Sequence, residues 1–262
     1  MHKNENQRTA VVTGASSGIG RAVARRLQAD GFHVLAVARR GDRLEALAAE
    51  TGVSTLVVDV SDGASVDRLA ERAAELFPQG VSALINVAGG ALGVDWVERA
   101  DFEKWTGMYA SNVLGAGRVT KALLPQIRTA GGGDIVFLTS TAAQVAYEGG
   151  SGYNAAKAAE HMLAAALRLE LAGEPIRVIE VAPGLVHTDE FSLTRLGGDQ
   201  AAADAVYEGV EKPLTAQDVA DVIAYSIELP AHVNLDLITM RPVAQAAAHK
   251  LMRRPLEVKR TP

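Results

Sequence analysis

The sequence predicts an α/β fold: a single doubly wound domain in which a seven-stranded parallel sheet is flanked by helices. Two observations predict it. Short, almost wholly apolar runs recur along the chain, and between them apolar residues return at the three- and four-residue spacing of amphipathic helices. Strands that are apolar on both faces are typical of a parallel sheet covered on each side.

The first strand and helix are the most clearly marked elements. Residues 9–13 form a β-branched run that stops at Gly14. Beyond the turn, Ile19, Val23 and Leu27 recur at helical spacing. In order, the expected strands cover residues 9–13, 33–38, 55–58, 83–85, 134–139, 176–181 and 235–240, with helical stretches between them.

Two segments depart from this alternation. Residues 184–213 are rich in glycine, and we expect them to form a long irregular loop over a substrate site. Thr215 and Asp218 have the spacing of a helix cap, so a helix is expected from there toward Leu229. The predicted organisation is a polar extension over 1–8, one domain over 9–243 and a tail over 244–262. The tail is basic toward its end and is either frayed or an arm that packs on another subunit.

Composition excludes several classes of function. The 262 residues carry a net charge of −5, so no broad basic field is present to attract nucleic acid or an anionic membrane. The chain has no cysteine, and its six histidines form no ligand-spaced cluster, so no metal site is expected. No apolar run approaches the length of a membrane span. We therefore expect a cytoplasmic protein that acts on small molecules.

The turn after the first strand has the form of a phosphate-binding loop. Its sequence, TGASSGIG, places Gly14, Gly18 and Gly20 between a strand and a helix. Glycines permit a tight turn and close backbone approach, and the free N–H groups of a helix N-terminus attract phosphate. Because the spacing differs from G-x-G-x-x-G, the turn alone is weak evidence, but its position predicts dinucleotide binding. Ser16 and Ser17 offer hydroxyls to the same phosphates.

The end of the second strand favours NADP(H) over NAD. Arg39 and Arg40 follow the strand, and no carboxylate appears before Asp42. An arginine at this point accommodates the 2′-phosphate of NADP, whereas an acidic residue binds the ribose hydroxyls of NAD. We prefer Arg39 for this contact; the alternative is that both arginines are solvated. Asp59, after the third strand, is placed either to bind the adenine amino group or to cap a helix.

A tyrosine and a lysine lie four residues apart where a long alanine-rich helix is expected to begin. In the segment SGYNAAK, Tyr153 and Lys157 would share one helix face. A cation beside a phenol stabilises the phenolate and makes proton transfer feasible. On its own, the pair could equally be a chance arrangement on a solvated face.

Taken together, these motifs resemble those of the short-chain dehydrogenase/reductase family, and the match runs from about residue 8 to residue 243. The following segments occur in the order and spacing of that family: TGASSGIG, Asp59-Val60, Asn86-Val87-Ala88-Gly89, Asn112, Ser140, Tyr153 with Lys157, and Pro183-Gly184. The resemblance implies a Rossmann fold. One departure is Val87, which stands where the family has a second asparagine, and a local repacking is expected there.

The resemblance assigns roles to individual residues. It implies that Tyr153 exchanges a proton with the substrate, that Lys157 supports Tyr153 and holds the nicotinamide ribose, and that Ser140 orients the substrate carbonyl. Asn112 would anchor a water that relays protons. The implied cofactor contacts are Gly14, Ser16, Ser17, Gly18, Ile19, Gly20, Arg39, Arg40, Asp59, Val60, Asn86, Ala88, Gly89, Tyr153, Lys157, Pro183, Gly184, Val186 and Thr188.

Within the family, the segments GLVHTDEFSLTRLGG and LPAHVNLDLITMRPV are similar to those of NADP-dependent 3-hydroxy acid dehydrogenases that act on serine or allo-threonine. A carboxylate substrate needs a cation, which Arg195 or Arg241 could supply. Two other functions stay open: a ketone or aldehyde reductase with a secondary-metabolic substrate, and a catalytically silent NADP(H)-binding sensor. The resemblance also implies a homotetramer built on the helix that follows Tyr153 and on its neighbouring helix.

Overall fold

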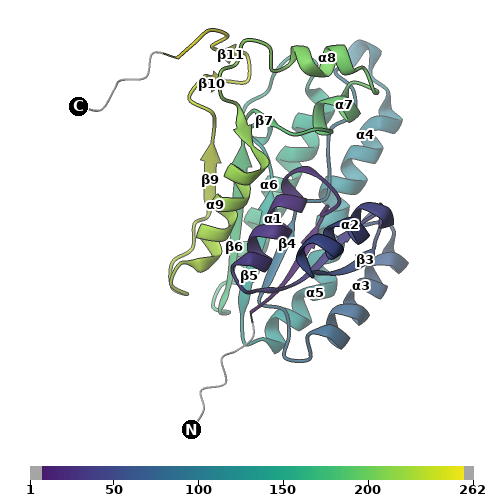
Figure 1. Ribbon diagram of the computed structural model, residues 1–262, viewed down its shortest axis with the longest axis vertical. Helices are drawn as coiled ribbons and strands as arrows, with labels where there is room; N and C mark the ends of the chain where they lie inside the picture. The colour runs from purple at the N-terminus through teal and green to yellow at the C-terminus, as the bar shows by residue number, and fades with distance from the viewer. Residues whose placement is uncertain (1–7, 257–262) are drawn as a thin grey trace, which may run out of the picture.

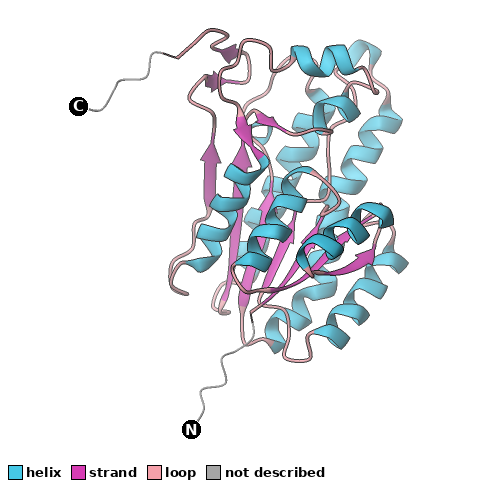
Figure 2. Ribbon diagram, viewed as in Figure 1, coloured by secondary structure: helices cyan, strands magenta, loops and turns pink. Residues whose placement is uncertain are grey.

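The computed structural model describes residues 8–256. Figure 1 shows a central sheet with helices on both sides, as Figure 2 makes plain by colour. The strands of the sheet are β1 (Thr9–Thr13), β2 (His33–Ala38), β3 (Ser54–Val57), β4 (Ala83–Asn86), β5 (Gly133–Leu138), β6 (Ile176–Pro183) and β9 (Leu237–Met240). They pair in the order β3-β2-β1-β4-β5-β6-β9, and every pairing is parallel. The seven-stranded parallel sheet and its doubly wound architecture are confirmed.

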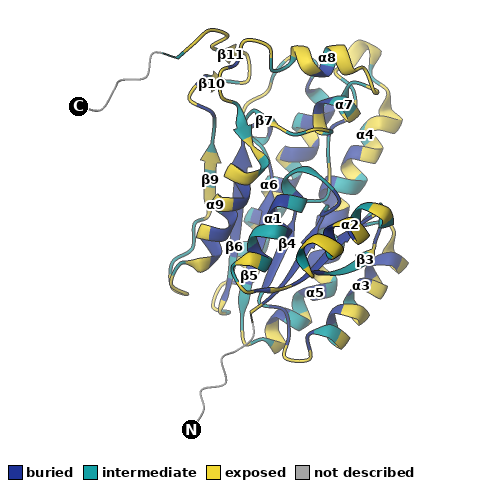
Figure 3. Cartoon of the chain, viewed as in Figure 1, coloured by how far each residue is buried: buried dark blue, intermediate teal, exposed yellow. Residues whose placement is uncertain are grey.

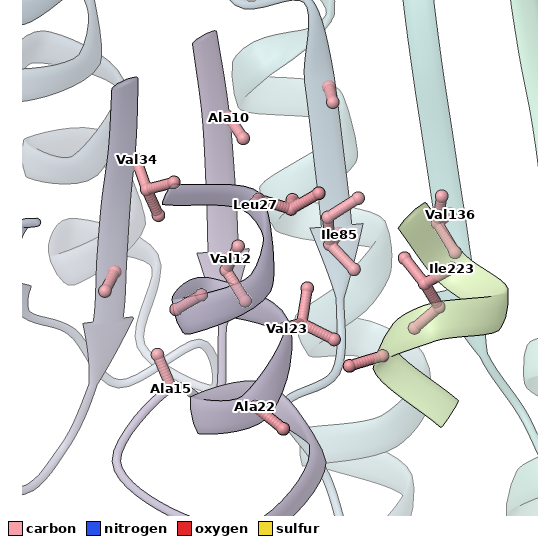
Figure 4. Packing of buried hydrophobic residues seen from close by; sticks show 14 of the residues in the cluster. Ala10, Val12, Ala15, Ala22, Val23, Leu27, Val34, Ile85, Val136 and Ile223 are labelled. Atoms are coloured by element: carbon pink, nitrogen blue, oxygen red, sulfur yellow. The ribbon is translucent and has the colours of Figure 1, made fainter. Parts of the chain in front are cut away.

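Helices form a layer on each face of the sheet. One face carries α1 (Gly18–Ala29), α2 (Gly41–Thr51) and α9 (Ala216–Glu228), and the other carries α3 (Gly63–Leu76), α5 (Ala116–Thr129) and α6 (Ser151–Glu170). Each layer has its own apolar core. Figure 4 shows the first, where Val23 and Leu27 of α1 pack on Val12 and Ile85 of the strands and on Ile223 of α9. Figure 3 shows buried residues along the sheet and exposed ones on the outer helix faces, the pattern expected of amphipathic helices.

Two helix ends follow directly from sequence. Thr215 and Asp218 form a reciprocal capping box at the start of α9, as predicted: the Thr215 hydroxyl accepts from the Asp218 N–H at 3.1 Å, and the Asp218 carboxylate accepts from the Thr215 N–H at 2.7 Å. At the end of α2, Gly52 adopts a left-handed conformation with φ of 78°, which favours glycine.

The loop predicted over 184–213 is more ordered than its composition suggested. It contains a short strand β7 (Val186–His187), which pairs with β8 (Leu214–Thr215), and two short helices, α7 (Phe191–Arg195) and α8 (Gln200–Ala205). The Tyr207 hydroxyl, which donates to the Val186 carbonyl and contacts the Ser192 hydroxyl, ties these pieces together. Such contacts between distant residues leave no periodic pattern, so the prediction of an irregular loop was wrong.

Residues 244–256 fold back over the loop. They form a hairpin of β10 (Gln245–Ala247) and β11 (Lys250–Leu251), near α7 and α8 at the upper end of the sheet in Figure 1. Arg253 then donates hydrogen bonds to the carbonyls of Ala205, Val206 and Glu208, just beyond α8. This part of the tail is therefore packed on its own chain. Residues 1–7 of the predicted extension, and Lys259 and Arg260 of the tail, lie outside the described residues.

The helices of residues 8–256 include none that is long and apolar enough to cross a membrane.

Candidate active site

A large cavity, of about 940 Å³, lies at the carboxyl ends of the parallel strands. It is lined by residues that follow β1, β2, β4, β5 and β6, with the segment around α7 closing it from above. The volume is at the upper end of the range for small-molecule and cofactor sites. All but one of the residues expected to contact the cofactor line it; Asn86 does not.

In the turn between β1 and α1, the glycines leave space open that a side chain at the same positions would occupy. A Cβ at Gly20 would lie 2.3 Å from the Gly14 carbonyl oxygen, so only glycine allows α1 to start this close to the sheet. Gly14 and Gly18 have φ values of 68° and 50°, in the left-handed region. Gly18, Ile19 and Gly20 line the cavity, so the first turn of α1 borders the space where a pyrophosphate would bind.

The structure distinguishes the two arginines after β2. Arg40 turns back over the glycine turn, where its guanidinium donates to the Ser16 hydroxyl at 2.9 Å and the Ser17 hydroxyl at 2.8 Å. Arg39 is exposed, although it also lines the cavity. Arg40 additionally forms an ion pair with Glu190 at 2.8 Å. Geometry thus favours Arg40 over the Arg39 that the sequence suggested, because Arg40 is the one gathered with both serine hydroxyls.

Asp59 and Val60 border the cavity beyond β3. One carboxylate oxygen of Asp59 accepts from the Ser61 N–H at 2.9 Å, whereas the cap of α3 is Asp62. The helix-capping alternative for Asp59 is therefore wrong. Its second carboxylate oxygen has no hydrogen bond in the described part of the chain and can accept from a ligand.

The segment after β4 is held by Thr13 of β1. The Thr13 hydroxyl accepts from the N–H groups of Val87 and Ala88, at 2.9 and 3.0 Å. Val87, at the departure from the family pattern, packs against the core beneath α1. Asn86 lies inside the sheet and donates to the Thr120 hydroxyl at 3.1 Å. Asn86 therefore supports the cavity wall, and Ala88 and Gly89 form the wall itself.

Asn112 lies in a π-helical segment, Ala110–Gly115, between α4 (Phe102–Tyr109) and α5. Its side chain is fully buried and bonded to Gly90 on both sides: it accepts from the Gly90 N–H at 3.1 Å and donates to the Gly90 carbonyl at 3.0 Å. A further bond reaches the Met108 carbonyl at 2.8 Å. Since the side chain is occupied, any water that Asn112 anchors would have to use its main-chain carbonyl. π segments of this kind are frequent at functional sites.

Ser140, Tyr153 and Lys157 meet where β5 ends and α6 begins. Ser140 follows β5, and its hydroxyl donates to the Pro183 carbonyl at 3.4 Å and accepts from the Ala142 N–H at 3.1 Å. Tyr153 is 8% exposed, and the Lys157 ammonium lies 6.0 Å from the centre of its ring. All three residues line the cavity, which brings the predicted proton-transfer groups together.

Lys157 has a partner that sequence reasoning missed. Its ammonium donates to the Leu138 carbonyl at 2.8 Å and to the Glu160 carboxylate at 2.7 Å. Burial lowers the pKa of Lys157, but Glu160 opposes this effect and the net pKa lies above its usual value. The i,i+3 spacing of Lys157 and Glu160 was visible in the sequence and could have revealed the pair.

Arg195, the last residue of α7, reaches the cavity next to Tyr153. Its guanidinium carbon lies 5.6 Å from the centre of the Tyr153 ring and 5.4 Å from that of Tyr147. Its Nε donates to the Gly93 carbonyl at 3.2 Å, and the Gly93 N–H donates back to the Arg195 carbonyl at 2.8 Å. The alternative cation, Arg241, does not line the cavity. Tyr147 was not predicted; burial raises its pKa, and Arg195 partly opposes that rise.

The segment after β6 completes the wall. Pro183, Gly184, Val186 and Thr188 line the cavity, and Thr188 faces the glycine turn, where a Cβ on Gly18 would lie 3.5 Å from its methyl group. The donor set fits a dinucleotide phosphate at one end, and the buried tyrosine and lysine with the partly buried Ser140 fit proton transfer at the other. Hydroxyl and carbonyl interconversion is the chemistry that this arrangement can support.

Comparisons with known proteins agree with this geometry. A family model described as short chain dehydrogenase matches residues 8–195. An uncharacterized oxidoreductase of Mycobacterium tuberculosis is 52% identical over 250 residues, which are 95% of this chain and 97% of that protein. Sulfoacetaldehyde reductase 2 of Chromohalobacter salexigens is 42% identical over 241 residues, covering 90% of this chain and 94% of the relative.

A solved structure extends the likeness to three dimensions. The closed form of serine dehydrogenase complexed with NADP+ matches with a TM-score of 0.88 and 34% identity, covering 97% of this chain and all of that chain. Agreement in sequence and in structure over nearly the whole length shows that the chain belongs to the short-chain dehydrogenase/reductase family.

Proposed function

We propose that the protein catalyses reversible, NADP(H)-linked oxidation of a small 3-hydroxy acid, such as serine or allo-threonine, or reduction of the matching carbonyl compound. The observation that carries this proposal is the position of Arg195, which brings a guanidinium beside Tyr153 in a cavity bounded by Ser140 and Lys157. A guanidinium binds a carboxylate through paired, charge-assisted hydrogen bonds. An acid held there presents a nearby hydroxyl to the tyrosine.

The roles of the residues follow from their positions. NADP(H), when bound, accepts or supplies the hydride. The Tyr153 oxygen takes up or returns the proton of the substrate hydroxyl, and the Ser140 hydroxyl orients the substrate oxygen. The Lys157 charge stabilises the phenolate form of Tyr153. The glycine turn would hold the cofactor phosphates, with Arg40 at the 2′-phosphate and Asp59 at the adenine.

A second candidate is reduction of a small sulfonated aldehyde. The relative at 42% identity is named a sulfoacetaldehyde reductase, and a guanidinium binds a sulfonate as readily as a carboxylate. This candidate is an aldehyde-reductase form of the alternative that the sequence left open. Initial rates with NADP(H), measured by nicotinamide absorbance over a panel of 3-hydroxy acids, sulfoacetaldehyde and uncharged ketones, separate the candidates. If the protein binds NADPH but consumes no NADPH with any of these substrates, it is instead the silent sensor.

Replacing Tyr153 tests the chemistry. Tyr153→Phe removes the proton-transferring oxygen and keeps the ring, so kcat should fall about 100-fold or more on every accepted substrate. NADPH binding, followed by nucleotide fluorescence, is the control and should change little. A kcat near the unmutated value would exclude Tyr153 as the acid-base group.

Replacing the arginines after β2 tests the cofactor. Arg40→Ala should weaken NADPH binding about 10-fold or more and NADH binding much less, because charge-assisted hydrogen bonds to the 2′-phosphate are lost. Arg39→Ala should have a smaller effect, and Arg43→Ala, which alters a neighbouring arginine outside the cavity wall, serves as the matched control. Equal losses for both nucleotides in Arg40→Ala would remove Arg40 from this role; titration by quenching of tryptophan fluorescence gives the constants.

Replacing Arg195 tests the substrate class. Arg195→Gln should lower kcat/KM about 10- to 100-fold for carboxylate or sulfonate substrates and leave uncharged ketones nearly unaffected. Because Arg195 also donates a hydrogen bond to Gly93, its replacement can disturb the loop. The test is therefore the ratio of the loss in kcat/KM for charged substrates to the loss for uncharged ketones. A loss that is the same for charged and uncharged substrates would show that Arg195 acts only on the loop.

We also propose a cytoplasmic homotetramer, in line with the cysteine-free sequence and with the apolar surface beside α6. Tyr109, Leu114 and Met162 are 46%, 42% and 63% exposed on and near this helix. A hollow of about 320 Å³ beside Tyr109 and Leu114 is lined mostly by apolar residues of α4, the π-helical segment and α6. Exposed apolar patches of this kind mark contacts between subunits. Sedimentation velocity at micromolar concentration should give the tetramer mass, and a monomer would contradict it.

A further inference from the structure

The Lys157 ammonium is buried beneath the cavity, and two oxygens hold it. Its side chain is 6% exposed, and that of its partner Glu160 is 2% exposed. One bond runs to the Glu160 carboxylate at 2.7 Å and another to the Leu138 carbonyl at 2.8 Å. An ammonium has three donors, so one remains for Tyr153 or a ligand. Glu160 and Leu138 together therefore fix where this charge lies.

Burial of a lone ammonium is unfavourable unless a counter-charge accompanies it. Here burial lowers the pKa of Lys157, and Glu160 is the largest of the effects that raise it again, followed by Tyr153 and Glu180. The net pKa lies above the usual value. The negative charge of Glu160 consequently stabilises the positive charge beside Tyr153.

Glu160 is itself unusual, because it faces both a cation and a second buried carboxylate. Glu180, on β6, accepts from the Thr139 hydroxyl at 2.9 Å and contacts the His161 ring at 2.7 Å. Burial raises the pKa of Glu160 to about 7; Lys157 opposes the rise and Glu180 adds to it. Glu160 thus changes its charge near neutral pH, where the other carboxylates of an ordinary protein are already ionised.

We propose that Glu160 is a positioning residue of the active site, which holds the Lys157 ammonium in place and supplies the negative charge that balances it. This inference rests on the proposed function, since it acts through Lys157 and Tyr153. Below neutral pH the pair carries a net positive charge, and above it the pair is neutral. An anion at this point makes every neighbouring proton harder to remove.

Glu160→Gln tests this directly, because the amide keeps the shape and can still accept from Lys157 while it carries no charge. The acid limb of the kcat/KM profile for alcohol oxidation, followed from about pH 5 to about pH 10, should move to lower pH by about one unit, because the phenolate forms more readily without the neighbouring anion. Since the pKa of Lys157 lies above its usual value, the alkaline limb of the unmutated enzyme lies beyond this range, and it should enter the range in the variant because Lys157 loses its proton earlier. Limbs that stay at the pH of the unmutated enzyme would overturn the proposal.

The chain offers a matched control in Glu75. Arg72 and Glu75 on α3 have the same i,i+3 spacing and a 2.9 Å contact, but their side chains are 44% and 67% exposed. Glu75→Gln should therefore leave both limbs in place. Glu160→Asp, which retains the charge on a shorter side chain, should restore the limbs even where kcat is lowered. A purely structural role for Glu160 would instead lower kcat in both variants and move neither limb.

Failure of this inference can be told apart from failure of the proposed function. If Tyr153→Phe abolishes turnover and Glu160→Gln leaves the limbs in place, only the role of Glu160 is wrong. If Tyr153→Phe retains turnover, the proposed function is wrong. Should Glu160→Gln not fold, an infrared titration of the unmutated enzyme decides: the buried carboxyl must be ionised above neutral pH, and a protonated carboxyl band that persists to about pH 9 overturns the proposal.

Discussion

The shared direction of the seven strands is the constraint on which the site depends. Because all of them run parallel, their carboxyl ends meet at one edge, and the loops that follow β1, β2, β4, β5 and β6 converge there. The chain passes outward from β1 to β3 and then returns to the other side of β1 with β4. A crevice opens where the strand order reverses in this way, and ligands of such sheets bind in it. The cavity lies at this point, and the contact between Gly14 and Gly20 keeps α1 close enough to border it.

The roof of the cavity is built by a different principle from its floor. The floor consists of strand ends whose positions follow from regular pairing. The roof consists of short pieces joined by single hydrogen bonds. One example is Gln245 in the tail, whose side-chain amide oxygen Oε1 accepts from the Leu185 N–H at 2.8 Å. A Cβ on Gly184 would lie 2.2 Å from that same oxygen, so the glycine lets the tail approach. Gln245 and Ala248 of the tail thus line the cavity, although sequence reasoning placed the tail outside the domain.

Sequence alone predicts the floor well and the roof poorly, for physical reasons. The strands from residues 9–13 and 33–38 agree with the structure residue for residue, because a buried strand leaves a continuous apolar run. Tyr153 and Lys157 were found because helical spacing is local. Which of Arg39 and Arg40 turns inward depends on the path of a turn, and two adjacent residues of one type carry no signal for that. Glu180 is visible in the sequence as an acidic residue within an apolar strand. Its partners His161 and Thr139 come from other elements, and this is why its role was missed.

The helix α7 links the two ends of the cavity. Just before it, Glu190 pairs with Arg40 and Arg43 beside the glycine turn. At its end, Arg195 exchanges two hydrogen bonds with Gly93 and faces Tyr153, while the ring of Phe191 lies 6.0 Å from that of Tyr153. A short helix behaves as a rigid body, so any shift of α7 that breaks the contacts of Glu190 also moves Arg195. Since a cofactor phosphate at Arg40 would compete with Glu190, occupation of the cofactor end would bear on the position of Arg195, the cation proposed to bind the substrate, through this short helix.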